Sequence, residues 1–304
     1  MEKGKFKERF TKFHDKNYKL LILIPVALLL FGFVYMGFFY SQHHDFIYKD
    51  VSLTGGTTAT VNVIDKPIDI NNLKNAISGK LEGVNIREIS DLITNKQTAI
   101  VVETKSDSQI TKTVLENYLG YSLDEQNSSF EFTRSGLSEN FYKQLLIAVL
   151  IAFVLMAIVV FIQFKTIVPS LTVISCAFAD IFMTLVTANI LGLQISTAGI
   201  VAFLMLIGYS VDTDILLTTK AIKRDNGSLN KRLFESFKTG ITMTLTAIFS
   251  VSVSLIIIGS FSSILSQIFT IMLIGLIFDI INTWVTNASI IKWYALKKQK
   301  KHEA

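Results

Sequence analysis

The chain has 304 residues, of which 50 % are hydrophobic and only 17 % are charged, and its mean hydropathy is +0.47. This composition predicts a membrane protein rather than a soluble domain. Three prolines and 16 glycines exclude a collagen-like or linker-dominated chain, and the single cysteine, Cys176, excludes a disulfide scaffold or a metal site built from cysteines.

Six apolar runs are long enough to cross a bilayer, whose hydrocarbon core of about 30 Å requires about 20 helical residues. They comprise residues 20–40, 141–163, 167–191, 196–219, 240–259 and 265–291. The first run follows a basic stretch, as in a signal peptide, but it is too long for a typical signal-peptide core and no Ala-x-Ala cleavage site follows it. We therefore expect six membrane helices, the first of them uncleaved.

Lys and Arg separate sharply between the segments that join these runs. Residues 1–19, Lys165, residues 220–238 and residues 292–304 hold nineteen of the 29 basic residues, whereas residues 41–140 hold nine against fourteen acidic ones. Cytoplasmic loops retain Lys and Arg. We therefore predict a multi-pass protein of the cytoplasmic membrane with both termini inside. Its parts are a cytoplasmic N-terminus at 1–19, an exported domain at 41–140, a five-helix bundle at 141–291 and a cytoplasmic tail at 292–304. We expect the two basic termini of the chain to contact membrane lipids as well.

The segment 41–140 shows the short patterns of a soluble domain. Strands are predicted at 58–64, 84–93, 97–104 and 128–133, and helices at 70–82 and 108–120. The order β-α-β-β-α-β predicts an α+β ferredoxin-like (βαββαβ) sandwich. Just before the first strand, Gly55 and Gly56 predict a sharp turn with positive φ. No catalytic group, metal or other cofactor is expected in this domain, because its acidic residues are scattered as on a solvated face.

Four carboxylates interrupt the apolar runs: Asp180, Asp212, Asp214 and Asp279. A charged aspartate at the centre of a membrane helix costs about 2.5–3.5 kcal/mol on an insertion scale, so it requires compensation. Spans two to six hold no Lys or Arg beyond the end positions Lys143 and Lys165, so countercharge has to come from protons, sodium ions or a partner subunit. Burial penalises the charged form of a carboxyl group, which makes proton exchange chemically plausible. The alternative is that these aspartates only hydrogen-bond neighbouring helices as packing.

Two sets of polar residues are expected to line one hydrated seam with Asp279. They are Asn282, Thr283, Thr286 and Asn287 on the last span, and Thr242, Thr246, Ser250 and Ser254, which recur every four residues along the fifth.

Asp212 and Asp214 are two residues apart, so they differ in direction by about 200° on a regular helix and only one of them should point into the bundle. We expect Asp212 to be the deeper residue and Asp214 to reach the interface more easily. Gly208 lies one turn before Asp212, where it would allow close helix approach or local unwinding.

Three segments resemble a known family. Residues 208–220 (GYSVDTDILLTTK) closely resemble the fourth-span motif of the SecF family of protein-export membrane proteins in its archaeal form, within the SecD/SecF family. Residues 275–294 (GLIFDIINTWVTNASIIKWY) are similar to the end of that family's last span, and residues 53–57 (LTGGT) to the turn that begins its exported domain. With the six-span layout, the resemblance covers almost the whole chain.

The resemblance implies a half-transporter of the resistance-nodulation-division superfamily. Such a subunit pairs with SecD beside the SecY channel complex and uses an ion (proton) gradient to help secreted polypeptides leave the channel. Bacterial relatives carry their acid at the position of Thr213, so Asp212 and Asp214 are both candidates for the coupling role. Our candidate ion-coupling residues are Asp212, Asp214, Asp180 and Asp279, with supporting positions at Gly208, Thr213, Asn282 and Thr246.

A second hypothesis is a homodimeric exporter of lipid or small amphiphilic molecules from the same superfamily. An enzyme is not expected. The four histidines, at positions 14, 43, 44 and 302, form no recognisable pattern with a nucleophile, and the chain has no Walker-type phosphate loop. Nucleic-acid binding by the basic ends is not expected either.

Overall fold

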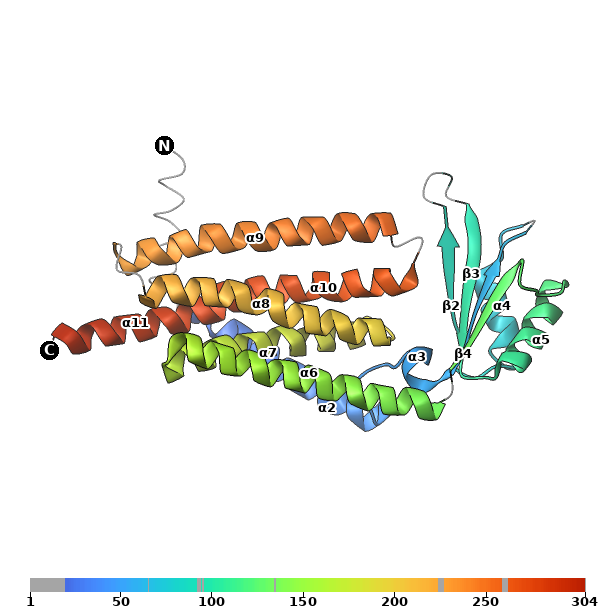
Figure 1. The fold of residues 1–304 in the computed structure, drawn as a ribbon, viewed down its shortest axis with the longest axis horizontal. Coiled ribbons are helices and arrows are strands. Elements are labelled where there is room, and N and C mark those ends of the chain that lie inside the picture. The colour runs from blue at the N-terminus through green and yellow to red at the C-terminus, as the bar shows by residue number, and fades with distance from the viewer. Residues whose placement is uncertain are drawn as a thin grey trace.

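The computed structural model describes residues 20–64, 66–91, 94, 96–133, 135–223, 227–258 and 262–303. Long helices lie side by side in one bundle, and a small α+β domain stands beyond one end of it (Figure 1). In the described part, six helices are long and apolar enough to cross a membrane. The bundle consists of α2 (Leu23–His43), α6 (Ser135–Phe164), α7 (Ile167–Ile190), α8 (Thr197–Lys223), α9 (Leu229–Ile258) and a last span formed by α10 (Ser263–Ile281), η1 (Asn282–Asn287) and α11 (Ala288–Glu303).

Each apolar run of the sequence largely coincides with or lies inside one of these helices, so the prediction of six membrane helices is confirmed. The fifth helix, α9, begins at Leu229 rather than at residue 240. Its first turns are amphipathic rather than apolar, and they bury Leu229 and Leu233 in a cluster with Ile291 of α11. The predicted N-terminal segment 1–19 lies outside the described residues.

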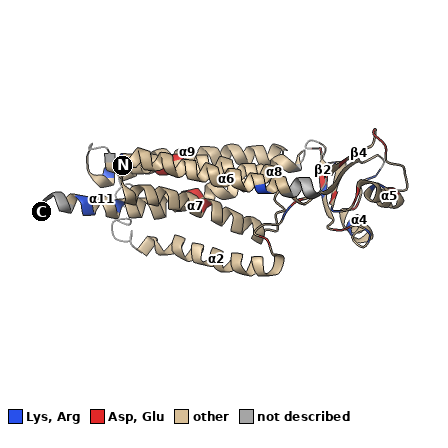
Figure 2. Ribbon diagram, turned by 60° about the horizontal axis from the view of Figure 1, so that its bottom comes forward, with Lys and Arg blue, Asp and Glu red and all other residues tan. Residues whose placement is uncertain are grey.

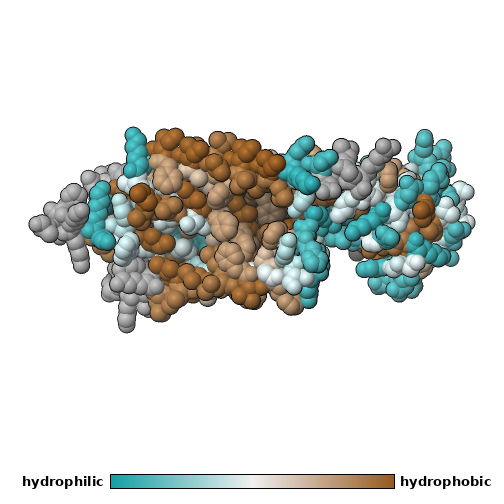
Figure 3. All heavy atoms as spheres, turned by 90° about the horizontal axis from the view of Figure 1, so that it is seen from below, coloured by the Kyte–Doolittle hydropathy of each residue, from teal (hydrophilic) through white to brown (hydrophobic). Residues whose placement is uncertain are grey.

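The surface of the bundle is a hydrophobic belt between two hydrophilic ends (Figure 3). The sheet domain is at one of these ends, and the basic residues of α11 are at the other (Figure 2). Inside the bundle, α8 and α10 approach closely where Gly275 leaves room for the side chain of Leu206, since a methyl group on Gly275 would overlap it.

The α+β domain has the predicted order of elements. After a short helix α3 (Val51–Thr54) come β1 (Gly56–Asn62), α4 (Ile70–Ile77), β2 (Asn85–Ser90), β3 (Gln97–Thr104), α5 (Ser108–Leu119) and β4 (Ser128–Thr133). The strand order is β2-β3-β1-β4, and all neighbours are antiparallel. Strand β3 therefore lies between β1 and β2 and splits the β1-α4-β2 unit.

Helices α4 and α5 cover one face of this sheet. Leu73 and Leu115 on these helices pack against Val61 and Ile100 on the strands, and all four side chains are buried. Strand residues alternate between faces. The neighbouring pair Thr58 and Glu103 therefore lies on the opposite face, which is turned toward the bundle (Figure 1).

The predicted glycine turn is present where α3 passes into β1. Gly55 has φ 80° and Gly56 has φ 138°, a region that side chains other than glycine rarely adopt. A methyl group on Gly56 would also overlap the carbonyl group of Thr104. Both geometry and space therefore require glycine at the start of the sheet.

Candidate functional site

Three of the four aspartates meet inside the bundle. Asp180 of α7, Asp214 of α8 and Asp279 of α10 come from three different helices, and their exposed fractions are 0 %, 0 % and 1 %. Figure 2 shows acidic positions within the otherwise largely uncharged helices.

Each carboxylate is held by uncharged donors. The hydroxyl of Ser210 donates to Asp180 at 2.5 Å, and the amide of Asn282 donates to the other oxygen of Asp180 at 2.6 Å. The amide of Asn287 donates to Oδ1 of Asp214 at 2.7 Å.

The Asp279 carboxylate accepts hydrogen bonds from threonine hydroxyls of three helices. Thr213 of α8 lies at 3.1 Å, Thr283 of η1 at 3.2 Å and Thr244 of α9 at 3.3 Å. The site therefore draws side chains from four of the six spans, and its geometry depends on how those helices pack.

Thr283 connects two of the acids. Its hydroxyl lies 2.9 Å from Oδ1 of Asp214 and 3.2 Å from Oδ1 of Asp279. One hydroxyl has one proton to donate, so it can donate to only one carboxylate at a time, while its oxygen can accept from the other carboxyl group when that group is protonated. Thr283 is therefore placed to pass a proton between Asp279 and Asp214.

The second oxygen of Asp214 is the exception in this satisfied cluster. Oδ2 of Asp214 is buried and has no hydrogen-bond partner. A buried carboxylate oxygen without a donor is costly when charged, whereas a protonated carboxyl group leaves only a neutral hydroxyl there. This atom is where the cluster would best accommodate a bound proton.

The last span is not a regular α-helix at the site. Residues Asn282–Asn287 form a π-helical turn between α10 and α11. This turn carries Asn282, Thr283 and Asn287, each of which donates to one of the three aspartates. π-Helical turns are rare and occur frequently at functional sites. Sequence pattern predicted the polar residues of this span but not the turn that directs them inward.

Asp212 is outside this cluster. Its side chain is exposed on the surface of α8, whereas Asp214 is fully buried. The prediction that only one of the two points into the bundle is confirmed, and that residue is Asp214. The expectation that Asp214 reaches the membrane interface more easily is wrong, because its side chain is fully buried between helices. Gly208, one turn earlier, is also exposed, and a side chain there would meet nothing within 4 Å. Helix α8 continues through it, so of the two expected alternatives, close helix approach or local unwinding, the unwinding is absent.

The polar stripe predicted on the fifth span is also placed differently. Thr242 and Thr246 are exposed, and each donates to the carbonyl four residues earlier in its own helix. The expectation that they line the seam with Asp279 is wrong, because Thr244 faces inward instead. Sequence reasoning missed both Thr244 and Ser210. The signal available for Ser210 was its position one helical turn before Asp214.

The arrangement is suited to holding protons. Like charges disfavour one another, and burial disfavours each charged carboxylate, so simultaneous ionisation of the three buried aspartates is strongly unfavourable. Among the described residues, no group of three or more His, Cys, Asp or Glu has a geometry that could hold a metal ion.

Comparisons with known proteins agree on one family. Residues 93–297 match the family model for the C-terminal region of protein export membrane protein SecD/SecF. The chain is 39 % identical over 291 residues to the protein-export membrane protein SecF of Methanocaldococcus jannaschii, covering 94 % of this chain and 99 % of that protein. It is 34 % identical over 283 residues to the corresponding protein of Methanothermobacter thermautotrophicus, covering 92 % and 93 %.

Among solved structures, the fold is similar to the crystal structure of SecDF, a translocon-associated membrane protein, from Thermus thermophilus. The TM-score is 0.70 at 17 % sequence identity, and the match covers 91 % of this chain but only 38 % of that chain. The present chain thus spans less than half the length of this structural relative. A second structure, of SecDF in a super-membrane-facing form, matches with a TM-score of 0.56 at 19 % identity, over 92 % of this chain and 39 % of that one.

Proposed function

Because the chain belongs to the SecD/SecF family of protein-export membrane proteins, we propose that it is the SecF-like subunit of a SecD–SecF accessory complex of the Sec translocase. In this role it uses a proton gradient to promote export of secreted polypeptides from the SecY channel across the cytoplasmic membrane. The observation that carries the proposal is the buried cluster of Asp180, Asp214 and Asp279, with Thr283 between two of the acids.

The orientation follows from charge. The basic residues of α11 lie at the end of the bundle away from the sheet, and cytoplasmic segments retain Lys and Arg (Figure 2). We place both termini in the cytoplasm and the α+β domain, within residues 41–140, outside. The acid cluster then lies in the membrane between the two compartments.

A direct test is to deplete the chain in its host and follow export of a secreted reporter. We expect slower export, restored by the wild-type chain and lost again when a protonophore collapses the proton gradient. Export that a sodium ionophore abolishes and a protonophore leaves unchanged would contradict the use of a proton gradient. The alternative, a homodimeric exporter of lipid or small amphiphiles, predicts that affinity purification recovers only further copies of this chain.

The exposed face of α8 supports a partner subunit. Asp212 and Gly208 lie on this face, one helical turn apart. A carboxylate facing lipid is costly, and glycine in a membrane helix allows a second helix to approach closely. We propose that a helix of SecD packs here and supplies polar groups for Asp212.

The substitution Gly208→Leu tests this face. Because a side chain at this position meets nothing within the chain, we expect an unchanged amount of folded protein but at least about tenfold less co-purified SecD, since small residues at such interfaces permit close packing. Gly37→Leu on α2 is the matched control, since Gly37 is also exposed with nothing within 4 Å. Equal SecD recovery from both variants would contradict the proposed interface.

A further inference from the structure

A short stretch of backbone before the α+β domain is hydrogen-bonded to the bundle. Lys49 pairs with Ile195 of the α7–α8 turn in an isolated parallel bridge. The amide of Asp50 donates to the carbonyl of Ile195 at 3.0 Å, and the amide of Ile195 donates to the carbonyl of Tyr48 at 2.6 Å. The linker that leads from α2 to the sheet is therefore fixed to the α7–α8 turn by backbone hydrogen bonds.

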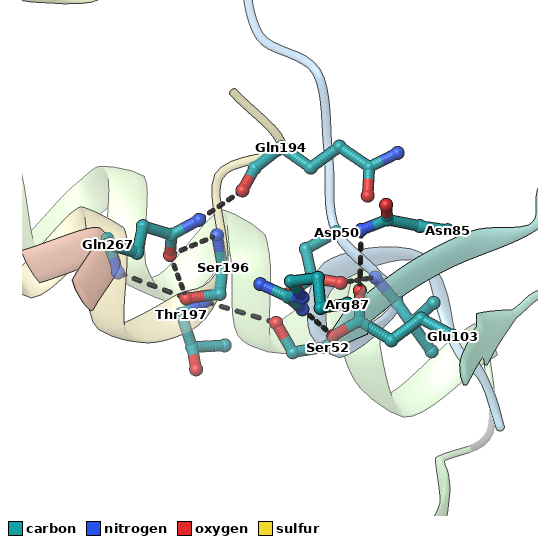
Figure 4. Close-up of polar contacts among 11 residues, drawn as sticks. Asp50, Ser52, Asn85, Arg87, Glu103, Gln194, Ser196, Thr197 and Gln267 are labelled. Atoms are coloured by element: carbon teal, nitrogen blue, oxygen red, sulfur yellow. Dashed lines mark hydrogen bonds and ion pairs between the residues drawn. The ribbon is translucent and has the colours of Figure 1, made fainter. Parts of the chain in front are cut away.

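Gln267 of α10 holds this turn from its other side. Its amide group donates to the carbonyl of Gln194, and its Oε1 accepts from the backbone amide of Ser196 at 3.1 Å and from the Ser196 hydroxyl (Figure 4). One side chain thus contacts the turn at two residues. Gln267 lies on the same helix as Asp279, twelve residues earlier, or about 18 Å along the axis.

On the far side of the linker, charged groups connect it to the sheet. Asp50 caps α3, where its Oδ1 accepts from the amide of Val51 at 2.5 Å. Arg87 of β2 interacts with the charge of Asp50 and forms an ion pair with Glu103 of β3 (Figure 4). Hydrogen bonds therefore run from α10 through the α7–α8 turn to Asp50 in the linker, and the charge of Arg87 then links Asp50 to the sheet.

The surroundings of this path are not densely packed. Two cavities of about 360 Å³ and 320 Å³ lie between the open sheet face and the end of the bundle, and both are bordered by Ile89 and Ser262. Space of this size leaves the domain room to shift relative to the helices. The polar path is one connection through which such a shift can follow the bundle.

We propose that Gln267 is a positioning residue that transmits the state of the acid cluster to the α+β domain through the α7–α8 turn and Asp50. The inference rests on the proposed ion-coupled function, because it assigns the connection between the acids and the exported domain. A displacement of α10 that accompanies proton binding at Asp279 pulls on Gln194 and Ser196 and is carried to the linker. The hydrogen bonds of Gln267 are to Gln194 and Ser196 and not to the acids.

The test measures domain position in the full chain. Spin labels at Ser129→Cys and Ile264→Cys, two exposed positions that border the same cavity from opposite sides, report the distance between sheet and bundle in liposomes. The native Cys176 is buried and serves as a protected background. We expect a pH gradient to shift this distance, and Asp214→Asn to abolish the shift.

Gln267→Leu is expected to reduce the shift at least about threefold and to slow export, with unchanged protein abundance. Ser196→Ala, which removes only one hydroxyl of the same contact, should reduce it in the same direction and guards against misfolding of the leucine variant. Thr270→Val is the matched control. Thr270 borders the first cavity one turn along α10, but its hydroxyl bonds only within its own helix, so the full shift should remain.

The two proposals fail in different ways. A full shift in both Gln267→Leu and Ser196→Ala, while Asp214→Asn abolishes it, overturns the positioning role alone. A full gradient-driven shift together with wild-type export in Asp214→Asn overturns the proposed function itself. An equal loss of shift in Thr270→Val would show that any change in this helix has the same effect, and would also overturn the specific role of Gln267.

Discussion

Replacing Asp214 with Asn is expected to lower gradient-driven export at least about tenfold, because the substitution removes the titratable group of a buried membrane carboxylate. Asn has nearly the shape of Asp, so the buried site is not emptied, and its side chain can still accept from Asn287 and Thr283. The measurement is the rate at which a secreted reporter is exported in cells that have the variant as their only copy.

Asp212→Asn is the matched control for this experiment. It makes the same chemical change two residues away on the same helix, at a side chain that is exposed rather than buried. We expect export within about twofold of wild type, because a polar side chain at a helix interface keeps its hydrogen bonds. Equal and severe losses of export in Asp212→Asn and Asp214→Asn would mean that burial of Asp214 does not give it a distinct role in export.

The same pair of variants separates coupling from packing. If the aspartates serve only as hydrogen-bonding groups between helices, Asn at position 214 satisfies the same donors and export continues at the wild-type rate. That result would exclude Asp214 from the coupling mechanism. Quantifying the chain in the membrane by immunoblot distinguishes loss of coupling from loss of protein.

The membrane helices could be predicted because they obey a simple physical constraint. A span needs about 20 apolar residues, and an acid within one must be compensated, so both the helices and their four unusual residues are visible in sequence. The order of elements in the α+β domain was equally visible, because strands and helices repeat their apolar residues with different periods.

Which side of α8 faces the interior of the bundle could not be predicted in the same way. Asp212 and Asp214 differ by about 200° in direction, but each has helical neighbours that fit an interface, such as Gly208 for one and Ser210 for the other. The choice depends on the opposite helices, which present Thr283 and Asn287 from a π-helical turn. Such a turn changes the period locally and has no apolar pattern of its own.

A second large effect is expected where the α+β domain meets the end of the bundle. There, Arg87→Met should destabilise the α+β domain by about 3 kcal/mol at pH 7.5, as for a buried ion pair that loses one partner. Arg87 pairs with Glu103, whose side chain is 6 % exposed, and the substitution leaves Glu103 and nearby Asp50 without their counterion. The arginine keeps 31 % of its own side chain in solvent, so we place the effect at the low end of the usual range.

The loss should depend on pH with a defined sign. Burial raises the pKa of Asp50 above its ordinary value, and the charge of Arg87 partly opposes this rise. An acid whose pKa is raised by folding binds more protons when folded, so its contribution to stability falls as pH rises from the ordinary value of 3.8 through the raised one. Removing Arg87 raises that pKa further. The difference between variant and wild type should therefore be largest at neutral pH and shrink as the pH is lowered toward 5.

Hydrogen exchange of strands β2 and β3 in the full chain measures this difference, since the free energy of opening is obtained at each pH. Lys112→Met on α5 is the control, because Lys112 and Glu116 form a partly exposed pair at 3.9 Å that should contribute no more than about 0.5 kcal/mol. Asp50→Asn in the Arg87→Met background should recover part of the stability at pH 7.5, because Asn still caps a helix but carries no charge. A loss of stability that is equal at pH 7.5 and at pH 5, or one that Asp50→Asn does not relieve, would mean that Arg87 stabilises the α+β domain by packing rather than by charge.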